Sequence, residues 1–202
     1  MPRLSTELQA QRRQHVLTSA WRRFSEDGFH ATSMDDIVAA SGMSARAVYR
    51  YFPSKDELID AAAEEALTVL RGIFTRLLES EPAPTPAETI TALVDELSDR
   101  AANTAYDLSK IAMHAWSEAL RRPEAADRTR AFYRDVHGHL AELAVQWRTA
   151  GYLTADADPE DVATALVALM PGLIVNQHLV DPVTADQLIA GIASLGANVT
   201  ED

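Results

Sequence analysis

Cysteine is absent from this 202-residue sequence, and lysine occurs only twice. The lack of cysteine excludes disulfides, thiolate metal sites and cysteine nucleophiles. None of the eight glycines forms a G-x-G pattern, and neither Lys55 nor Lys110 lies in a phosphate-binding loop. The patterns H-E-x-x-H, G-x-S-x-G and E-x-x-H do not occur either. The sequence therefore predicts no catalytic centre, no cofactor and no metal site.

Long hydrophobic runs are also scarce. Residues 1–20 are polar and charged, so we expect no signal peptide. Residues 162–180 carry no formal charge, but they include Pro171, Gly172 and several polar side chains, and their compact apolar part ends at Val175. A membrane span needs roughly 20 predominantly apolar residues, so this stretch favours a buried or interface helix. We therefore expect a cytoplasmic protein without a membrane partner.

The net charge of −12 is unevenly distributed. Residues 1–55 contain eight basic and five acidic residues, which gives +3, whereas the remaining 147 residues carry −15. A mildly basic head on an acidic body is compatible with a head that binds a polyanion. It is equally compatible with an acidic protein whose charges are uneven by chance, so the charges alone do not decide between these interpretations.

Strand-like alternation is nearly absent, whereas helix-start patterns recur. Ser33 is followed by Asp36 and Thr85 by Glu88, which is the spacing of a capping box. We predict an all-α protein with about nine helices, in which a three-helix head (residues 1–55) is joined by a long helix to a helical body (residues 56–202). The predicted helices span residues 6–27, 34–40, 44–51, 55–79, 86–103, 105–121, 124–149, 159–180 (interrupted or kinked near Pro171) and 185–198.

Residues 32–55 are typical of a helix-turn-helix on physical grounds. Gly42 permits the left-handed backbone of a tight turn, and Ser44 can cap the helix that follows. Val48 and Phe52 lie four residues apart and can dock that helix on the core. The side chains then left around its exposed side are Arg46, Ala47, Tyr49, Arg50 and Tyr51. Such a short exposed helix suits the major groove of DNA.

This segment resembles the signature of the tetracycline-repressor (TetR) family. The positions in register with that signature are Thr32, Ile37, Gly42, Ser44, Tyr49, Tyr51, Phe52, Lys55 and Leu58. Upstream, Ala20, Phe24 and Gly28 match the first helix of the family. The sequence departs from the pattern at Val38 and Ser41, where the family usually has alanine, and at Met43, where it usually has valine. These departures concern packing inside the head.

The resemblance implies a DNA-binding role for residues of the head, Ser44 included. It implies phosphate contacts from Thr32 and Ser33 at the start of one helix, and from Tyr49, Tyr51 and Lys55. Arg46 and Ala47, which follow Ser44 at the start of the second helix, occupy the variable, base-reading part, where arginine can bond guanine and alanine can touch a thymine methyl group. Arg50 suits either contact, or a solvated charge.

For the body, the resemblance implies a small-molecule pocket and a dimer interface made by the last two helices. Candidate pocket residues are Met113, Trp116, Phe132, His139, Trp147 and Met170, for which core packing is an equally direct role. Candidate interface residues are Leu166, Leu173, Leu188, Ile192 and Leu195, for which an intramolecular core is the alternative. His137 and His139 point about 200° apart on a helix, so they do not favour a metal site.

We therefore expect a bacterial, ligand-responsive transcriptional regulator without enzymatic activity. As a repressor it would bind a palindromic operator as a homodimer, because one short helix reads few base pairs, and a small-molecule effector would release it. An activator, or a DNA-binding regulator controlled by a protein partner, is the alternative. A more remote alternative is a helical enzyme or carrier in which the helix-turn-helix motif is incidental.

Overall fold

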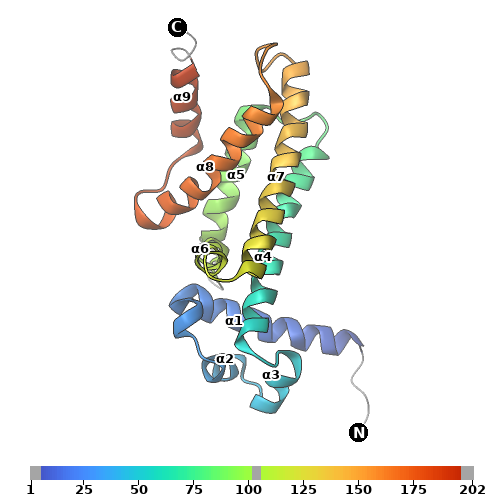
Figure 1. Ribbon diagram of the computed structural model, residues 1–202, viewed down its shortest axis with the longest axis vertical. Helices are drawn as coiled ribbons and strands as arrows, with labels where there is room; N and C mark the ends of the chain where they lie inside the picture. Colours follow the sequence, from blue (N-terminus) through green and yellow to red (C-terminus); the bar gives the residue numbers. More distant parts are fainter. Residues whose placement is uncertain (1–5, 102–105, 197–202) are drawn as a thin grey trace. The chain divides into compact units, whose positions relative to one another are not determined.

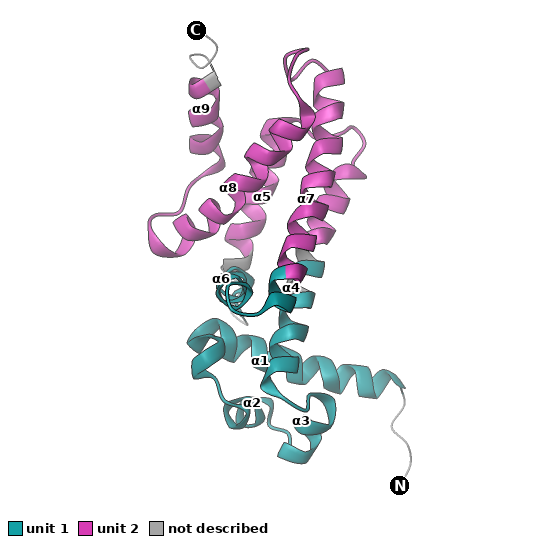
Figure 2. Cartoon of the chain, viewed as in Figure 1, with its two compact units in different colours: residues 1–68, 102–126 teal, residues 69–101, 127–202 magenta. Residues whose placement is uncertain are grey.

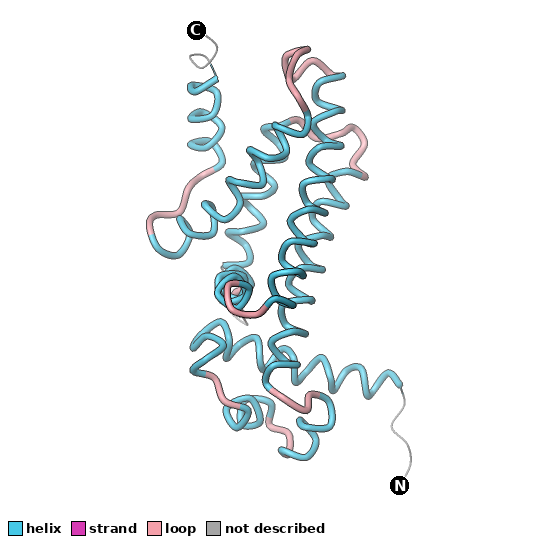
Figure 3. Tube along the Cα trace, in the orientation of Figure 1, coloured by secondary structure: helices cyan, strands magenta, loops and turns pink. Residues whose placement is uncertain are grey.

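The computed structural model describes residues 6–101 and 106–196, and within these ranges every regular element is a helix (Figures 1 and 3). The predicted all-α fold is confirmed. In chain order the helices are α1 (Thr6–Ala31), α2 (Met34–Ser41), α3 (Ala45–Tyr51), α4 (Lys55–Leu78), α5 (Pro86–Ala101), α6 (Leu108–Ala119), α7 (Pro123–Thr149), α8 (Pro159–Leu179) and α9 (Ala185–Gly196).

Most of the predicted helix bounds are confirmed to within a residue or two, and the exceptions are the end of α1, which lies at Ala31 and not at residue 27, and the start of α6. Helix α6 begins three residues later than predicted, because the Asp107 side chain accepts hydrogen bonds from the backbone N–H groups of Ser109 and Lys110 and caps the helix there. Helix α8 runs through Pro171 without the interruption that we considered. The predicted ends of α5 (residues 102–103) and α9 (residues 197–198) lie outside the described residues.

The end of α1 is shaped by Gly28. Its backbone is left-handed (φ 81°, ψ 170°), so the regular helix breaks at the predicted residue although helical turns continue to Ala31. A Cβ atom at this position would lie 2.9 Å from Cε1 of His114 on α6. Glycine is therefore required both by the backbone conformation and by the close approach of α6.

The chain divides into two compact units, drawn in two colours in Figure 2. The first comprises residues 1–68 and 102–126, and the second residues 69–101 and 127–202. Helices α4 and α7 each run from one unit into the other. The division between a DNA-binding domain (1–55) and a ligand-binding domain (56–202) concerns function and stays a prediction. Packing nevertheless places α6 in the same unit as the helix-turn-helix, which the sequence did not indicate.

The core of the first unit is built around α1, which contacts α2, α3 and α6. Trp21 and Phe24 are buried, and the rings of Phe24 and Phe29 meet edge to face with centroids 4.9 Å apart. Trp21 makes a similar contact with Tyr106 at 4.6 Å. Burying each such side chain contributes about 1.5–3 kcal/mol to the stability of the fold, so these rings stabilise the packing of the first unit around α1.

The second unit has its core on α7. Phe132, Leu143 and Trp147 are buried, and the Trp147 indole N–H donates to the carbonyl oxygen of Pro84 at 2.7 Å. Helices α8 and α9 contact α5, and most apolar side chains of α8 are half-buried and not fully buried. Among the described residues α8 is one helix that is long and apolar enough to cross a membrane by length and composition.

Candidate nucleic-acid interface

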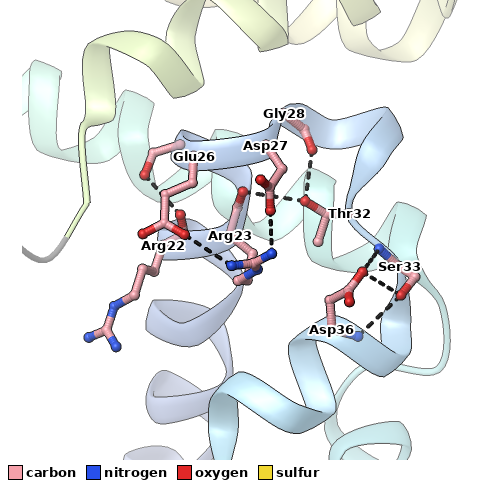
Figure 4. A network of polar contacts seen from close by, with 9 residues as sticks. Arg22, Arg23, Glu26, Asp27, Gly28, Thr32, Ser33 and Asp36 are labelled. Atoms are coloured by element: carbon pink, nitrogen blue, oxygen red, sulfur yellow. Dashed lines mark hydrogen bonds and ion pairs between the residues drawn. The ribbon is translucent and has the colours of Figure 1, made fainter.

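Helix α2 starts at a complete capping box. The Ser33 hydroxyl accepts from the Asp36 backbone N–H at 3.1 Å, and the Ser33 backbone N–H donates to the Asp36 carboxylate at 2.8 Å (Figure 4). Hydrogen bonds from the Ser33 hydroxyl and backbone hold the pKa of Asp36 below its usual value of 3.8. The predicted cap is therefore confirmed, and it sets the direction in which α2 leaves α1.

The turn between α2 and α3 depends on Gly42, whose φ of 63° is left-handed. Ser41, which stands where the TetR pattern usually has alanine, accepts from the Met43 backbone N–H through its hydroxyl. Its carbonyl oxygen lies 2.8 Å from Nε2 of His15 on α1 and accepts from it. The departure at Ser41 thus adds a side-chain hydrogen bond to the turn.

Helix α3 is capped by Ser44, whose hydroxyl accepts from the Ala47 backbone N–H at 3.3 Å. Val48 and Phe52 are buried, as predicted, so α3 docks by that face. The opposite side of α3 carries polar side chains into solvent, and a helix held in this way presents a preset surface to a ligand.

The predicted base-reading residues lie on that solvent side. Arg46 is exposed, and no hydrogen bond or ion pair to another described residue occupies its guanidinium. Ala47 is half-buried beside it, and Tyr49 keeps 43% of its surface exposed. Arg50 donates to the Tyr51 hydroxyl at 3.1 Å, with its guanidinium over the Tyr51 ring. These five side chains can therefore reach a partner together.

Two residues predicted to contact phosphates, Thr32 and Lys55, instead form hydrogen bonds within the described fold. Thr32 is 1% exposed, and its hydroxyl lies 2.8 Å from the carbonyl oxygen of Gly28, to which it donates (Figure 4). Lys55 donates to the carbonyl oxygens of Thr32 at 3.0 Å and His30 at 3.4 Å. An ammonium has three donors, so Lys55 can bind a phosphate as well, whereas the phosphate contact of the buried Thr32 side chain stays a prediction without geometric support.

The basic residues of α1 differ in their availability. The Arg23 guanidinium forms ion pairs with Glu26 at 3.1 Å and Asp27 at 2.5 Å, which Figure 4 shows side by side. This charge is therefore neutralised within the head. Counting basic residues in residues 1–55 overstates the positive charge that is free to meet an anion.

Sequence reasoning missed a polar seam between α1 and α6. His30 Nε2 lies 3.0 Å from Oε1 of the buried Glu118 and 3.2 Å from Nη1 of Arg121. His114 packs beside the Phe29 ring with centroids 5.5 Å apart. Because these contacts join α6 to the end of α1, a displacement of α6 would reach the helix-turn-helix directly. The sequence indicates these contacts only through the charged residues at the end of α6. Charged residues are equally common at helix ends that simply face solvent, so they did not predict the contacts.

The pKa of His114 lies below its usual value of 6.5, because burial disfavours the charged ring and the nearby His30 charge adds to this. The unfolded chain therefore takes up this proton at higher pH than the folded one, and stability is lost as the pH falls below 6.5. We expect His114→Gln to flatten the fall of the thermal midpoint between about pH 6.5 and pH 5.5. Thermal melts followed by circular dichroism measure this pH dependence. His178→Gln on α8 is the matched control, because it also removes one histidine. An equal slope in both variants would contradict the prediction.

The candidate pocket residues fall into both units, and their contact with a ligand stays a prediction. Met113 and Trp116 are half-buried on α6, in the first unit. Phe132 and Trp147 are buried in the second, where His139 and Met170 are half-buried. His139 Nδ1 lies 2.8 Å from the backbone oxygen of Asp135. In the described ranges no three metal-ligating side chains come together.

The candidate interface residues lie at an apolar surface of α8 and α9. Leu166, Leu173 and Leu188 are half-buried, whereas Ile192 is 39% and Leu195 67% exposed. The α9 residues line a groove of about 490 Å³ between α8 and α9. An intramolecular core therefore does not account for Ile192 and Leu195.

The two-helix motif, with its capped second helix exposed on a small head, defines a helix-turn-helix DNA-binding protein. Comparison with known families agrees. Residues 16–62 match the family described as bacterial regulatory proteins of the tetR family. Residues 86–195 match the C-terminal part of BetI-type transcriptional repressors. The chain belongs to the tetR family of bacterial regulatory proteins, and the expectation of a ligand-responsive transcriptional repressor is confirmed at the level of the family.

Individual relatives extend over most of the chain. A nicotine-responsive transcriptional repressor, HdnoR of Paenarthrobacter nicotinovorans, is 28% identical over 85% of this chain and 85% of its own. The regulator BetI of Rhizobium meliloti is 28% identical over 89% and 83%. Among solved structures, Salmonella enterica GusR is 26% identical, with a TM-score of 0.71 over 96% of this chain and 98% of its own. The relatives are transcriptional regulators, which is the class that the head defines.

Proposed function

We propose that this protein is a homodimeric repressor that binds a palindromic operator and is released by a small organic effector. The observation that carries the proposal is the surface of α3, where Arg46 has no described partner and Tyr49 is 43% exposed while Val48 and Phe52 are buried. An exposed helix of this kind fits the major groove, and its arginine can bond O6 and N7 of guanine.

Dimerisation is supported by the groove between α8 and α9. Ile192 and Leu195 are exposed there among other apolar side chains, and most apolar side chains of α8 are only half-buried. Large exposed apolar patches mark interaction sites in soluble proteins. A second copy related by a two-fold axis would cover both grooves and would place two copies of α3 on the two halves of a palindrome.

The effector is proposed to be a small organic molecule bound in the acidic body. The nicotine response stated for a relative that is 28% identical supports this class. Among the candidate pocket residues, the half-buried Trp116 suits a molecule with apolar and cationic parts. The effector must bind the conformation that fits DNA poorly more tightly than the other, and a coupling of about 1–3 kcal/mol is typical. The protein is proposed to act in the cytoplasm and to have no enzymatic activity.

The test of this function is selection of genomic DNA fragments by the purified protein, followed by sequencing and a salt titration on the best fragment. We expect a short palindrome, retained at low salt and released as salt rises. Nicotine is the first probe for release, and it should leave a non-palindromic control fragment unaffected. A folded dimer that retains no sequence at low salt would contradict the proposal.

Lys55→Ala is expected to weaken binding by a similar factor on every DNA sequence. The resemblance to the family implies a phosphate contact for Lys55, so its removal should also flatten the logarithmic salt slope by about one unit per half-site. Because Lys55 donates to two carbonyl oxygens near the end of α1, a lower thermal midpoint should accompany the change. Lys110→Ala on α6 is the matched control. An unchanged slope in Lys55→Ala would remove this residue from the interface.

A further inference from the structure

At the end of α3, the rings of two consecutive aromatic residues are each covered by the guanidinium group of an arginine. The Arg50 guanidinium lies over the Tyr51 ring, 4.9 Å from its centroid. The guanidinium of Arg13, which belongs to α1, lies over the Phe52 ring at 4.8 Å. Stacking holds a guanidinium by its face and leaves the N–H groups at its edge free to donate. Two oriented cations from different helices therefore lie at the same end of α3.

Arg13 has no carboxylate partner among the described residues. The arginines placed elsewhere are often paired: Arg23 with Glu26 and Asp27, and Arg71 with Asp135 at 2.9 Å. In a chain with 30 acidic and 18 basic residues, a cation that is held on a ring and left without an acid is available to an external anion.

A second observation that supports an anion site concerns the first ten described residues of α1. Residues 6–15 are helical and all exposed, so they bury no apolar face of their own against the head. In Figure 1 this half of α1 extends beyond α2 and α3, within the first unit. A helix extension that contributes no core still brings Arg13 to the end of α3. The contact between Arg13 and Phe52 ties this extension to the end of the DNA-facing helix.

We propose that Arg13 binds a phosphate of the operator backbone, so that the DNA contact extends from α3 onto the N-terminal half of α1. This inference rests on the proposed function and adds an element to its interface. The guanidinium fork matches the geometry of a phosphate, and its stack on Phe52 restricts the rotamers that would otherwise have to be ordered on binding. The contact positions the protein on DNA and reads no base.

The experiment uses the full-length protein and the operator recovered by fragment selection. We measure the logarithmic dependence of affinity on salt for the native protein, Arg13→Ala, Arg13→Lys and Arg134→Ala, an exposed arginine of α7. Each phosphate contact contributes about 0.9 to the slope, so losing one per head should flatten it by about 1.8 in the dimer. Arg13→Lys keeps the charge, and we expect the native slope with an affinity lowered several-fold. Arg134→Ala should match the native protein.

Phosphate ethylation interference locates the contact. One phosphate per half-site that blocks binding of the native protein should become indifferent for Arg13→Ala. If Arg13 only covers Phe52, Arg13→Ala will lower the thermal midpoint but keep the native slope and ethylation pattern, which overturns the proposal. If the native protein itself retains no operator, the proposed function fails instead, so the two failures are distinguishable.

Discussion

Arg46→Ala is expected to weaken specific operator binding by about 1–3 kcal/mol, which is roughly 5- to 150-fold, and to relax preference at one position of each half-site. Arg46 is exposed near the start of α3, and no described residue competes for its guanidinium. A bidentate contact to guanine would account for both effects, because alanine removes the donors and leaves the base unread. Titrations against the operator and each single-base variant of it measure the result.

Arg134→Ala is the matched control for Arg46→Ala, because it removes an exposed arginine from α7. We expect this variant to keep the native affinity and the native base preferences. A loss for Arg46→Ala that is equal on all DNA sequences would contradict base reading and would make Arg46 a phosphate contact.

Ile192→Glu is expected to convert the protein to a monomer and to lower operator affinity by about 10²–10⁴-fold, the usual gain from linking two binding modules. Ile192 is 39% exposed and lines the groove between α8 and α9. A carboxylate there would be buried without a partner in a two-fold interface, at a cost of several kcal/mol. Analytical ultracentrifugation measures the assembly state, and salt-controlled operator titration measures the affinity.

Leu120→Glu provides the control for Ile192→Glu, since Leu120 is 90% exposed at the end of α6. It should leave both the dimer and operator binding intact. Leu188→Glu tests the same groove at a second position. A dimer that survives both the Ile192 and the Leu188 substitution would place the interface elsewhere on the protein.

The helix-turn-helix could be predicted because its determinants are local. The Ser33 and Asp36 pair, the left-handed Gly42 and the Ser44 cap act over three or four residues, and each has its predicted contact. The late start of α6 was missed although Asp107 is a residue type that favours the N-cap. Its signal was present, but the sequence alone offered no reason to prefer it to a start at residue 105.

The sequence could not predict in the same way which charged side chains are available to bind DNA. Lys55 reaches the carbonyl oxygen of Thr32, which is 23 residues away in the sequence, and Arg13 reaches the Phe52 ring. Helix α6 packs against α1 in the unit of the head, where His114 closely approaches Gly28. None of these contacts follows from periodicity or capping, because each depends on which helices meet.

The sequence by itself determined the helices of this protein, the turn that pairs α2 with α3 and the identity of the family, because caps, glycine turns and apolar spacing act within a few residues. The tertiary structure decided which of those residues are free to meet DNA and which surface stays uncovered. It assigned Thr32 to the interior, left Arg46 without a described partner, and left Ile192 and Leu195 exposed. Burial and pairing depend on neighbours from distant parts of the chain, and only folding brings those neighbours together.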